Sequence, residues 1–447
     1  MVPGNPFFHR GPIRDRSYFF GRAPLLTRAL AFLAEGQSVA LVGPRRIGKT
    51  SLLFHLADAA ASPLRCAYLD CESWGQASAA QLYGRLARML QQAMTATPVA
   101  AALHDESAPA AFATLERVVA QATQQGLQLA LLLDEFEALS ANPHLDNDFF
   151  ASLRALAMEQ RLAYVTVSTR PLLDLTYARV RARSSPFFNF FALLRIGLFA
   201  RSESSALLRE LSARGDVPFT PPFIDALITV AGDHPFFLQM LGDYAFDAVA
   251  AGAPQTAASA AALLHGPFRE EASDHWGAFW ANLEAADQRL LALLPVLAPI
   301  QPAGLRRLEA AGLVARTTTG APTLLSDGFR AFVATQAVAG LVQAPPLTLD
   351  PALRVALRRG QPLPLTPQQF DLLAYLVTHQ ARLVPKTELA GAIWPRADVA
   401  NGLDSLRTTL KALRLALKED AGCLANLRGQ GYQFVPRDLD AASWDST

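Results

Sequence analysis

Cysteine is scarce in this sequence, with three residues in 447. Cys66 and Cys71 lie five positions apart in an apparent strand and would point to opposite faces, while Cys423 is remote from both. This spacing suits neither a zinc site nor a disulfide framework. We therefore expect ordinary thiols and a reducing compartment, the cytoplasm.

Long apolar runs are also missing. No stretch approaches the roughly 18 residues that a membrane span needs, because Pro295 and Pro299 interrupt the most apolar one, residues 290–300. Prolines and basic residues interrupt the first ten positions, so no signal-peptide core is expected there. The sequence therefore predicts no membrane partner.

A large excess of charge is the third absence, because 40 Lys and Arg face 39 Asp and Glu, a net charge of +1. Apolar residues make up 51% of the chain and charged residues 18%, which is typical of globular proteins and excludes a disordered chain. Affinity for nucleic acid must therefore be local. A chain of 447 residues is too long for one hydrophobic core and predicts about three or four domains.

Five short apolar segments predict the architecture of the first domain. They are continuous rather than alternating, and helical stretches separate them, which is typical of a parallel sheet covered by helices on both faces. The segments are residues 37–42, 64–70, 127–134, 162–168 and 190–199. The predicted fold class is therefore a multidomain α/β plus α+β protein.

Changes of pattern predict the domain boundaries. Residues 1–200 would form the parallel-sheet domain, and residues 201–284, in which the strands stop, a helical lid. Residues 285–342 carry two helical patterns and a hairpin pattern, as in a small winged helix. After a stiff linker, QAPP at 343–346, residues 347–436 predict short strands, three helices and a hairpin, and residues 437–447 an acidic tail.

Residues 43–51, GPRRIGKTS, fit the phosphate-binding pattern G-x4-G-K-[ST] and lie between a predicted strand and a predicted helix. The glycines let backbone N–H groups face phosphate oxygens, and the helix N-terminus adds positive potential. Lys49 is expected to reach the β- and γ-phosphates, and Thr50 to bind Mg²⁺. The sequence therefore predicts a P-loop that binds nucleotide through Gly43, Arg46, Gly48, Lys49, Thr50 and Ser51.

An acidic pair follows the apolar segment 127–133, namely Asp134 and Glu135. A magnesium-nucleotide site needs a carboxylate at the end of a neighbouring strand. Asp134 is therefore predicted to hold Mg²⁺ together with Thr50, and Glu135 to polarise the attacking water as a general base.

The segment Ser168, Thr169 and Arg170 ends the fourth predicted strand. Ligands of open α/β sheets bind at the carboxyl edge of the strands, so Arg170 is a candidate sensor of the γ-phosphate. An ordinary surface arginine after a strand is the alternative.

Several segments between residues 5 and 340 resemble the STAND NTPases, signal-transducing ATPases related to the AAA+ group. They are NPF at 5–7, FFGR at 19–22, GPRRIGKTSLL at 43–53, LLLDEFEAL at 131–139, VSTR at 167–170, SPFFNFF at 185–191 and GDHPFFLQ at 232–239. The resemblance implies ATP or ADP with Mg²⁺, slow hydrolysis, and a switch that is closed with ADP and open or oligomeric with ATP. ATP is preferred to GTP only through this resemblance.

The same resemblance assigns individual residues. It makes Arg170 the sensor, and His234 with Pro235 the residues that carry the nucleotide state into the lid. From the residues alone, a histidine before a proline is more often a packing residue at a helix start. No sensor repeat array is recognisable, so the signal protein or ligand is not identified. The residues implied to lie beside the adenine are Phe20, Gly21 and Arg22.

Residues 347–436 resemble the OmpR/PhoB-type winged-helix output domain. The segments that carry the resemblance are LTPQQFDLLAYL at 365–376, KTELAGAIW at 386–394, SLRTTLKALRLAL at 405–417 and NLRGQGYQF at 426–434. Thr366 is expected to cap the first helix together with Gln369. The apolar stripe expected on the inside of the 404–418 helix consists of Leu406, Leu410, Leu413 and Leu417.

The outer face of the 404–418 helix and the final hairpin are the candidate face for double-stranded DNA. Residues 347–436 carry 11 Lys and Arg against 7 Asp and Glu, whereas the rest of the chain carries 29 against 32. Asp404 and Ala412 depart from the basic residues common in that family, which places sequence-specific base contacts in doubt. A winged helix that contacts protein is the alternative. The candidate DNA contacts are Arg407, Thr408, Lys411, Arg414, Arg428 and Gln430.

Three functions agree with this order of motifs. The leading hypothesis is a transcriptional regulator whose DNA binding is switched by ATP and Mg²⁺, with a nucleotide-dependent homo-oligomer as a further expectation. The second is an origin-type or DNA-handling AAA+ ATPase. The third is a defence or signalling scaffold whose winged helix recognises protein.

Overall fold

The computed structural model describes residues 4–7, 10–94, 107–159, 162–172, 175, 187–427 and 430–436. Its contacts divide the chain into two compact units. The α/β unit consists of Phe8–Leu211 and His234–Gln239, and the C-terminal unit of Met1–Phe7, Ser212–Asp233 and Met240–Thr447. Among the described helices, none is both long and apolar enough to cross a membrane. The finer predicted division into domains remains a prediction.

A five-stranded parallel sheet forms the centre of the α/β unit, with the order β2-β3-β4-β1-β5. Its strands lie where the apolar segments predicted them, except that the fifth is shorter and ends at Arg195. Because all strands run in one direction, their carboxyl ends share one edge of the sheet. The strands are β1 (Ser38–Val42), β2 (Leu64–Asp70), β3 (Gln128–Asp134), β4 (Leu162–Ser168) and β5 (Phe191–Arg195).

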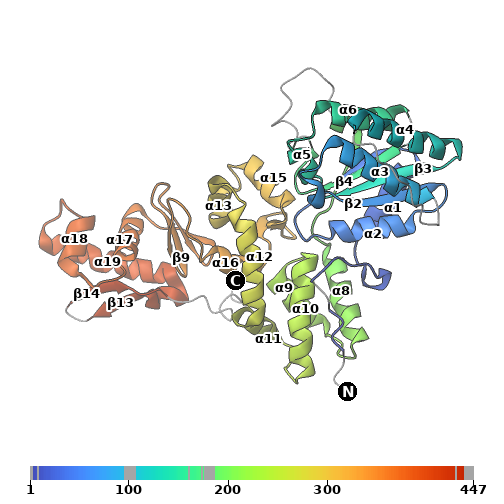
Figure 1. The fold of residues 1–447 in the computed structure, drawn as a ribbon. Coiled ribbons are helices and arrows are strands. Elements are labelled where there is room, and N and C mark those ends of the chain that lie inside the picture. Colours follow the sequence, from blue (N-terminus) through green and yellow to red (C-terminus); the bar gives the residue numbers. More distant parts are fainter. Residues whose placement is uncertain are drawn as a thin grey trace. The chain divides into compact units, whose positions relative to one another are not determined.

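Helices cover both faces of this sheet, as predicted (Figure 1). One face packs against α1 (Ala23–Ala34) and α2 (Lys49–Ala59), and the other against α3 (Ala79–Met94), α4 (Ala108–Gln124) and α6 (Asn147–Glu159). In β3, Leu131 packs on the face covered by α3, α4 and α6, and its neighbour Leu132 packs on the face covered by α1 and α2. The central strands β1, β3 and β4 are therefore buried on both sides, which explains their continuous apolar sequences.

The lid region is helical, as the sequence predicts. Two of its helices pass from one unit into the other: α8 begins in the α/β unit, and the first five residues of α10 belong to that unit. The helices are α8 (Arg201–Arg214), α9 (Pro221–Ala231), α10 (Pro235–Ala250), α11 (Ala257–Ala262) and α12 (Pro267–Ala281).

The chain start is anchored on α10 within the C-terminal unit. The side-chain amide of Asn5 donates to the carboxylates of Asp243, at 2.6 Å, and Asp247, at 2.9 Å. Phe7 is 6% exposed and packs over Gly242, where an added Cβ would lie 2.4 Å from the Phe7 ring. Glycine at this position therefore makes room for the aromatic ring.

The next region contains the predicted helices and hairpin of a small winged helix. The helices are α13 (Ala285–Ala292), α14 (Leu294–Leu297), α15 (Pro302–Ala310) and α16 (Asp327–Val333), and the hairpin consists of β6 (Val314–Arg316) and β7 (Pro322–Leu324). Phe329 of α16 is fully buried against Trp276 of α12, so this region shares a core with the lid.

The C-terminal module begins with an antiparallel sheet of order β11-β10-β9-β8 and ends with one of order β12-β14-β13. Part of the predicted linker is a strand, because Gln343 pairs with Thr348 and the two prolines 345 and 346 form the turn between β8 and β9. The strands are β8 (Val342–Ala344), β9 (Leu347–Asp350), β10 (Val355–Arg358), β11 (Gln361–Leu363), β12 (Val384–Pro385), β13 (Leu424–Leu427) and β14 (Gly431–Phe434).

Three helices lie between these sheets in sequence, α17 (Pro367–Thr378), α18 (Lys386–Ile393) and α19 (Val399–Leu417), and Figure 1 shows them packed together. The capping box of Thr366 and Gln369 is confirmed, with both hydrogen bonds present. The predicted stripe of α19 is confirmed as well, because all four leucines are buried. Because the leucine stripe packs inward, the opposite face of α19 is the outer one.

Candidate functional site

The loop between β1 and α2 is shaped by its glycines. The Gly43 N–H donates to the Ser168 carbonyl at the end of β4, at 3.1 Å, and an added Cβ on Gly43 would lie 2.4 Å from the Ile196 carbonyl. Gly48 has a φ of 97° and Arg46 a φ of 56°, both in the left-handed region. The loop therefore curls tightly against the sheet edge before α2 begins at Lys49.

Alanine at Gly43 is expected to lower the free energy of unfolding by about 1 to 3 kcal/mol, because its methyl group overlaps the backbone carbonyl of Ile196, directly after β5. Gly84 in α3 is the matched control, because an added Cβ there meets no atom within 4 Å. Alanine at Gly84 should raise stability by roughly 0.5 to 1 kcal/mol. Thermal unfolding of both variants checks these opposite signs, and equal destabilisation would contradict them.

Lys49 lies inside the loop that precedes it. Its ammonium group donates to the carbonyls of Gly43, at 3.0 Å, and Pro44, at 2.7 Å, and the residue is only 5% exposed. Burial lowers the pKa of Lys49, while the carboxylates of Glu135, Glu137 and Asp134 oppose this shift. A cation is thus held where the loop can surround a phosphate group.

Thr50 and Asp134 are brought together from different elements. The Thr50 hydroxyl donates to Asp134 Oδ2 at 2.7 Å, and the Tyr68 hydroxyl donates to the same oxygen at 3.2 Å. A hydroxyl and a carboxylate are the hard oxygen ligands that Mg²⁺ takes beside nucleotide phosphates. No group of three or more His, Cys, Asp or Glu side chains able to hold a metal occurs among the described residues. The donor set therefore suits a metal held jointly with phosphates.

Glu135 follows the end of β3 in a left-handed conformation, with a φ of 46°. Burial raises the pKa of its carboxyl group, and the nearby Lys49 opposes the rise. Its side chain faces the same cavity as Lys49. A carboxylate with a raised pKa is a better proton acceptor, so this geometry suits the predicted general base.

Within the α/β unit, Lys49, Thr50 and Glu135 line a cavity of about 570 Å³, whereas Asp134 is not among the lining residues. The first turn of α10 forms one wall, and the Arg46 guanidinium lies 4.4 Å from the centre of the Phe236 ring. The P-loop and the start of the lid therefore face one space. The lining residues are Arg10, Gly11, Pro12, Ile13, Arg46, Gly48, Lys49, Thr50, Ser51, Glu72, Glu135, Pro235, Phe236 and Gln239.

Arg22 is buried and contacts the P-loop through the Ile47 carbonyl. It is 5% exposed, and its guanidinium donates to the carbonyls of Gly197, at 2.8 Å, and Ile47, at 3.2 Å. Burial lowers the pKa of Arg22 to about 10. Gly21 has a φ of 68°, and an added Cβ would lie 2.7 Å from the Phe199 ring. Neither these residues nor Phe20 line the cavity, so their place beside an adenine remains a prediction.

Arg170 lies apart from the cavity. It is exposed after the end of β4 and is not among the residues that line the space around Lys49. Its backbone carbonyl accepts a hydrogen bond from the Ser168 hydroxyl at 2.7 Å. The sensor role of Arg170 therefore remains a prediction.

His234 is buried at the start of the lid, with 1% exposure. Burial lowers its pKa to about 3, and a hydrogen bond with the Arg45 backbone opposes the shift. Pro235, which follows it, begins α10 and lines the cavity. His234 is thus buried where the lid region begins, whereas its predicted contact with nucleotide is not tested.

The neutral state of His234 predicts how stability depends on pH. Below pH 6.5 the unfolded chain takes up a proton on this residue, but the folded protein does not until about pH 3. The free energy of unfolding should therefore fall by up to about 1.4 kcal/mol per pH unit more than in His234→Gln. Urea unfolding at pH 7, 6 and 5 measures both slopes. Equal slopes would contradict a buried neutral histidine.

The sequence interpretation missed three parts of the cavity. Residues 10–13 line it, and the Ile13 N–H donates to the Ser51 hydroxyl at 2.9 Å, but no motif marks this segment. Glu72 could have been found, because it follows β2 at the sheet edge where ligands bind. Phe236 and Gln239 lie in a segment singled out only for the histidine and proline before them.

The candidate DNA contacts on α19 and in the final hairpin differ in exposure and in their hydrogen-bond partners. Arg407 is exposed and lies 3.3 Å from the Asp404 carboxylate, and Lys411 is exposed. Arg414 instead donates to the Leu424 carbonyl at 2.9 Å, an intradomain contact. The Thr408 hydroxyl donates to the Asp404 carbonyl at 3.1 Å, and Gln430 is exposed. Arg428 lies outside the described residues.

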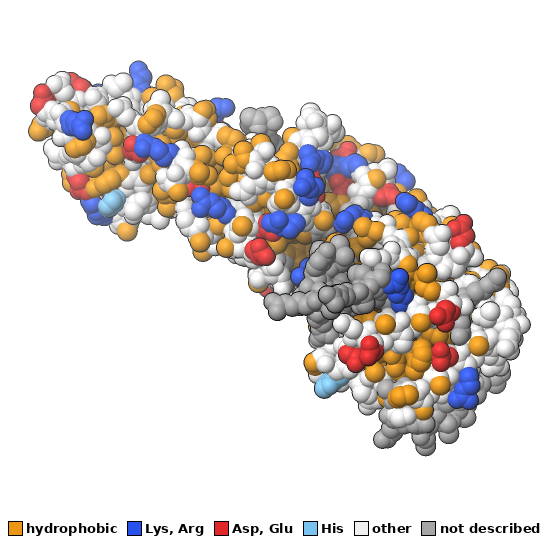
Figure 2. Space-filling view, turned by 90° about the horizontal axis from the view of Figure 1, so that it is seen from above, with side chains coloured by type: hydrophobic (Ala, Val, Ile, Leu, Met, Phe, Trp, Pro, Cys, Tyr) orange, Lys and Arg blue, Asp and Glu red, His pale blue; other side chains and the backbone are white. Residues whose placement is uncertain are grey.

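The Lys and Arg side chains are dispersed over the surface. On the face drawn in Figure 2, Lys and Arg side chains are spread among apolar and acidic ones and form no continuous basic patch. Within the C-terminal module, Arg358 and Arg359 are paired with the buried Asp420. Among the candidate DNA contacts that the structure describes, Arg407 and Lys411 are the exposed cations.

Comparison with known proteins identifies the two parts of the chain. Residues 81–288 match the family described as novel STAND NTPase 2, and residues 360–434 match the family described as transcriptional regulatory protein, C terminal. The chain joins a STAND-type NTPase region to an OmpR/PhoB-type C-terminal domain. The match to the STAND family begins after the P-loop, so the loop itself rests on its own motif and geometry.

The OmpR/PhoB-type domain has curated relatives. It is similar to the sensory transduction protein RegX3 of Mycolicibacterium smegmatis, with 31% identity over 98 residues, 21% of this chain and 42% of the relative. It is also similar to the two-component response regulator PhoP of Pseudomonas aeruginosa, with 31% identity over 102 residues, 22% and 45% respectively. The chain thus spans less than half the length of these relatives.

The STAND-type region has structural neighbours. A Walker-type ATPase of Pyrococcus abyssi superposes with a TM-score of 0.52 at 15% identity, covering 74% of this chain and 99% of that one. At this identity the likeness concerns the fold. The predicted P-loop NTPase fold, with a winged-helix domain after it, is confirmed.

Proposed function

We propose that this protein is a transcriptional regulator whose binding to double-stranded DNA is switched by ATP and ADP. The observation that supports this most directly is the wall of the nucleotide cavity. Pro235, Phe236 and Gln239 from the start of α10 face the same space as the P-loop. The remaining turns of α10 belong to the C-terminal unit, which also contains the OmpR/PhoB-type domain.

The P-loop residues would bind the phosphates of ATP. Backbone N–H groups of residues 46–50 and the N-terminus of α2 supply donors and positive potential. Lys49 would exchange its two carbonyl partners for the β- and γ-phosphate oxygens. Thr50 and Asp134 would hold Mg²⁺, which neutralises phosphate charge when bound. Glu135 would accept a proton from the attacking water in slow hydrolysis.

The γ-phosphate would supply the difference between two states. A ligand shifts a conformational equilibrium only if its contacts differ between the conformations. Arg46 lines the cavity and stacks on Phe236, so a phosphate that attracts the guanidinium competes with this contact. The proposed switch is therefore a change at the first turn of α10, with oligomerisation as a further consequence to be measured.

Alanine at Lys411 is expected to weaken DNA binding to all sequences alike and to reduce the salt slope by about one. The reason is that Lys411 is exposed on the candidate face of α19, and a lysine that contacts a phosphate adds affinity that does not depend on the base sequence. Fluorescence anisotropy with a labelled duplex at several salt concentrations measures the slope. Arg209→Ala removes an equally charged side chain, 63% exposed, from α8 and should change nothing.

The whole proposal is tested by retention of labelled genomic fragments without nucleotide, with ADP and with a non-hydrolysable ATP analogue. Selective retention that changes with nucleotide is expected. Retention that is salt-sensitive but has no sequence preference would favour the DNA-handling ATPase. No retention in any state would contradict the regulator and indicate that the C-terminal domain contacts protein.

A further inference from the structure

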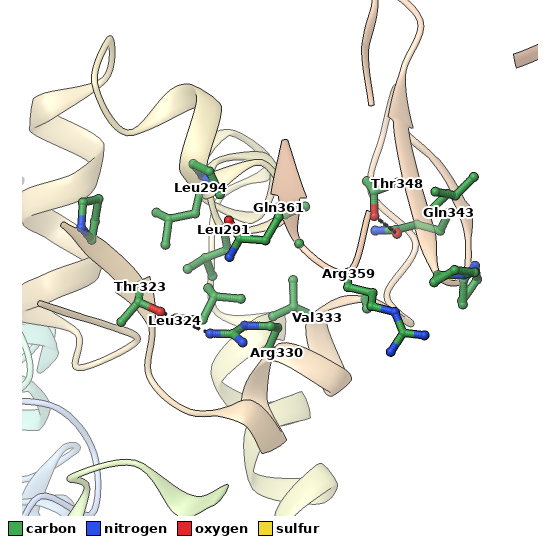
Figure 3. A pocket seen from close by; sticks show the side chains of 18 of the residues that line it. Leu291, Leu294, Thr323, Leu324, Arg330, Val333, Gln343, Thr348, Arg359 and Gln361 are labelled. Atoms are coloured by element: carbon green, nitrogen blue, oxygen red, sulfur yellow. Dashed lines mark hydrogen bonds between the residues drawn. The ribbon is translucent and has the colours of Figure 1, made fainter. Parts of the chain in front are cut away.

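A second cavity, of about 340 Å³, lies inside the C-terminal unit. One wall comes from the small winged helix, with Leu291, Leu294 and Leu324, and the other from the first sheet of the C-terminal module, with Gln343 and Thr348 (Figure 3). Its volume falls within the range of cavities that hold small organic ligands. It shares no lining residue with the nucleotide cavity.

The walls of this cavity are held in place by the protein itself. Arg289 of α13 forms an ion pair with Asp350 of β9, whose side chain is fully buried. Asp350 also accepts hydrogen bonds from the backbone N–H groups of Ala352 and Leu353, each at 3.0 Å. Five prolines contribute to the lining, and proline has little conformational freedom to lose on binding. The site is therefore largely preformed.

The chemistry of the lining selects one class of ligand. Apolar side chains dominate, and the charged residues that line it, among those that the structure describes, are Arg330 and Arg359 without any Asp or Glu. The carboxylates paired with them, Asp327 and Asp420, are not part of the lining. A ligand with an apolar body and an acceptor oxygen fits this environment better than a cation.

Gln343 supplies a specific donor. Its Oε1 accepts a hydrogen bond from the Thr348 hydroxyl at 2.9 Å (Figure 3). Its Nε2 is buried and has no hydrogen-bond partner among the described residues. Buried donors are nearly always paired in folded proteins, so a ligand oxygen that reached Gln343 would supply the acceptor that this N–H group lacks.

We propose that this cavity is an effector site that binds a small organic carboxylate with an apolar body, whose oxygen accepts a hydrogen bond from Gln343. Because both regions contribute walls, the bound molecule would stabilise the packing of the small winged helix against the C-terminal module. Binding itself does not depend on the proposed nucleotide switch.

Titration calorimetry of the full chain with 2-naphthoate, without nucleotide or DNA, tests the proposal. We expect one saturable site, with 2-naphthylmethylamine, the cationic counterpart, binding at least about tenfold more weakly. Gln343→Leu should weaken 2-naphthoate about fivefold through the lost hydrogen bond. Gln368→Leu, at an exposed glutamine on α17, should leave the affinity unchanged. Leu324→Trp should abolish binding by filling the cavity.

Three results would overturn the effector site. They are no saturable binding at millimolar concentration, equal affinity for the acid and the amine, and affinity that neither Gln343→Leu nor Leu324→Trp reduces. Thermal unfolding shows whether each variant is folded, and the two variants act on different walls. Loss of nucleotide-dependent DNA binding would instead concern the proposed function, so the two failures are distinguishable.

Discussion

Alanine at Lys49 is expected to weaken ATP binding by about 100-fold. Its ammonium group would donate to phosphate oxygens, and charge-assisted hydrogen bonds of this kind contribute roughly 1.5 to 3 kcal/mol. The residue is buried within the P-loop, where its ammonium group lies beside the carbonyls of Gly43 and Pro44. Equilibrium binding of a fluorescent ATP analogue measures the change.

Lys411→Ala is the matched control for this variant, because it removes the same side chain from the exposed face of α19. It should bind ATP normally and lose DNA affinity, the reverse of what Lys49→Ala does to the nucleotide site. ATP binding that survives Lys49→Ala unchanged would mean that the phosphate site has been assigned to the wrong loop.

Glutamine at Glu135 should lower ATP hydrolysis by a factor of about 100 to 10,000 while ATP still binds. The amide keeps the size and polarity of the side chain but cannot accept the proton of the attacking water. Burial raises the pKa of Glu135, so hydrolysis by the unmodified protein should decline with falling pH sooner than an exposed carboxylate would allow. Single-turnover phosphate release over a range of pH measures both effects.

Glu72 offers the comparison for Glu135, because its side chain lines the same cavity from the end of β2. Glu72→Gln should change hydrolysis far less than Glu135→Gln, since it follows a strand that carries no predicted catalytic group. A loss of similar size in both variants would assign the general base to the pair rather than to Glu135.

Much of the fold could be predicted because the physical signals are local. The strands β2 and β4 begin and end where their apolar runs do. For β4 the reason is burial at every position, which tolerates few polar residues. The capping box of Thr366 and the leucine stripe of α19 were equally visible in short segments. The P-loop was visible because its glycines are required by backbone geometry at Gly43 and Gly48.

What could not be predicted depends on contacts between distant parts of the sequence. Arg22 donates to carbonyls 25 and 175 positions away, so no local pattern distinguishes it from a ligand contact. Residues 10–13 reach the cavity through the Ser51 hydroxyl, 38 positions from Ile13. The sequence predicts a linker at Gln343 because two prolines follow it. The strand β8, which contains Gln343, is recognisable only from its pairing with β9.

If the proposed switch acts at the first turn of α10, this continuous helix would carry the movement to its far end. A helix of 16 residues is about 24 Å long at a rise of 1.5 Å per residue, and its first five residues lie in the α/β unit. Tilting it by about 5° at Pro235 would displace its far end by roughly 2 Å. The anchor of the chain start, at Asp243 and Asp247, lies along the same rod and would move with it. A small tilt of α10 beside the phosphate site would then become a larger displacement at the far end of the helix, because of the length of the helix.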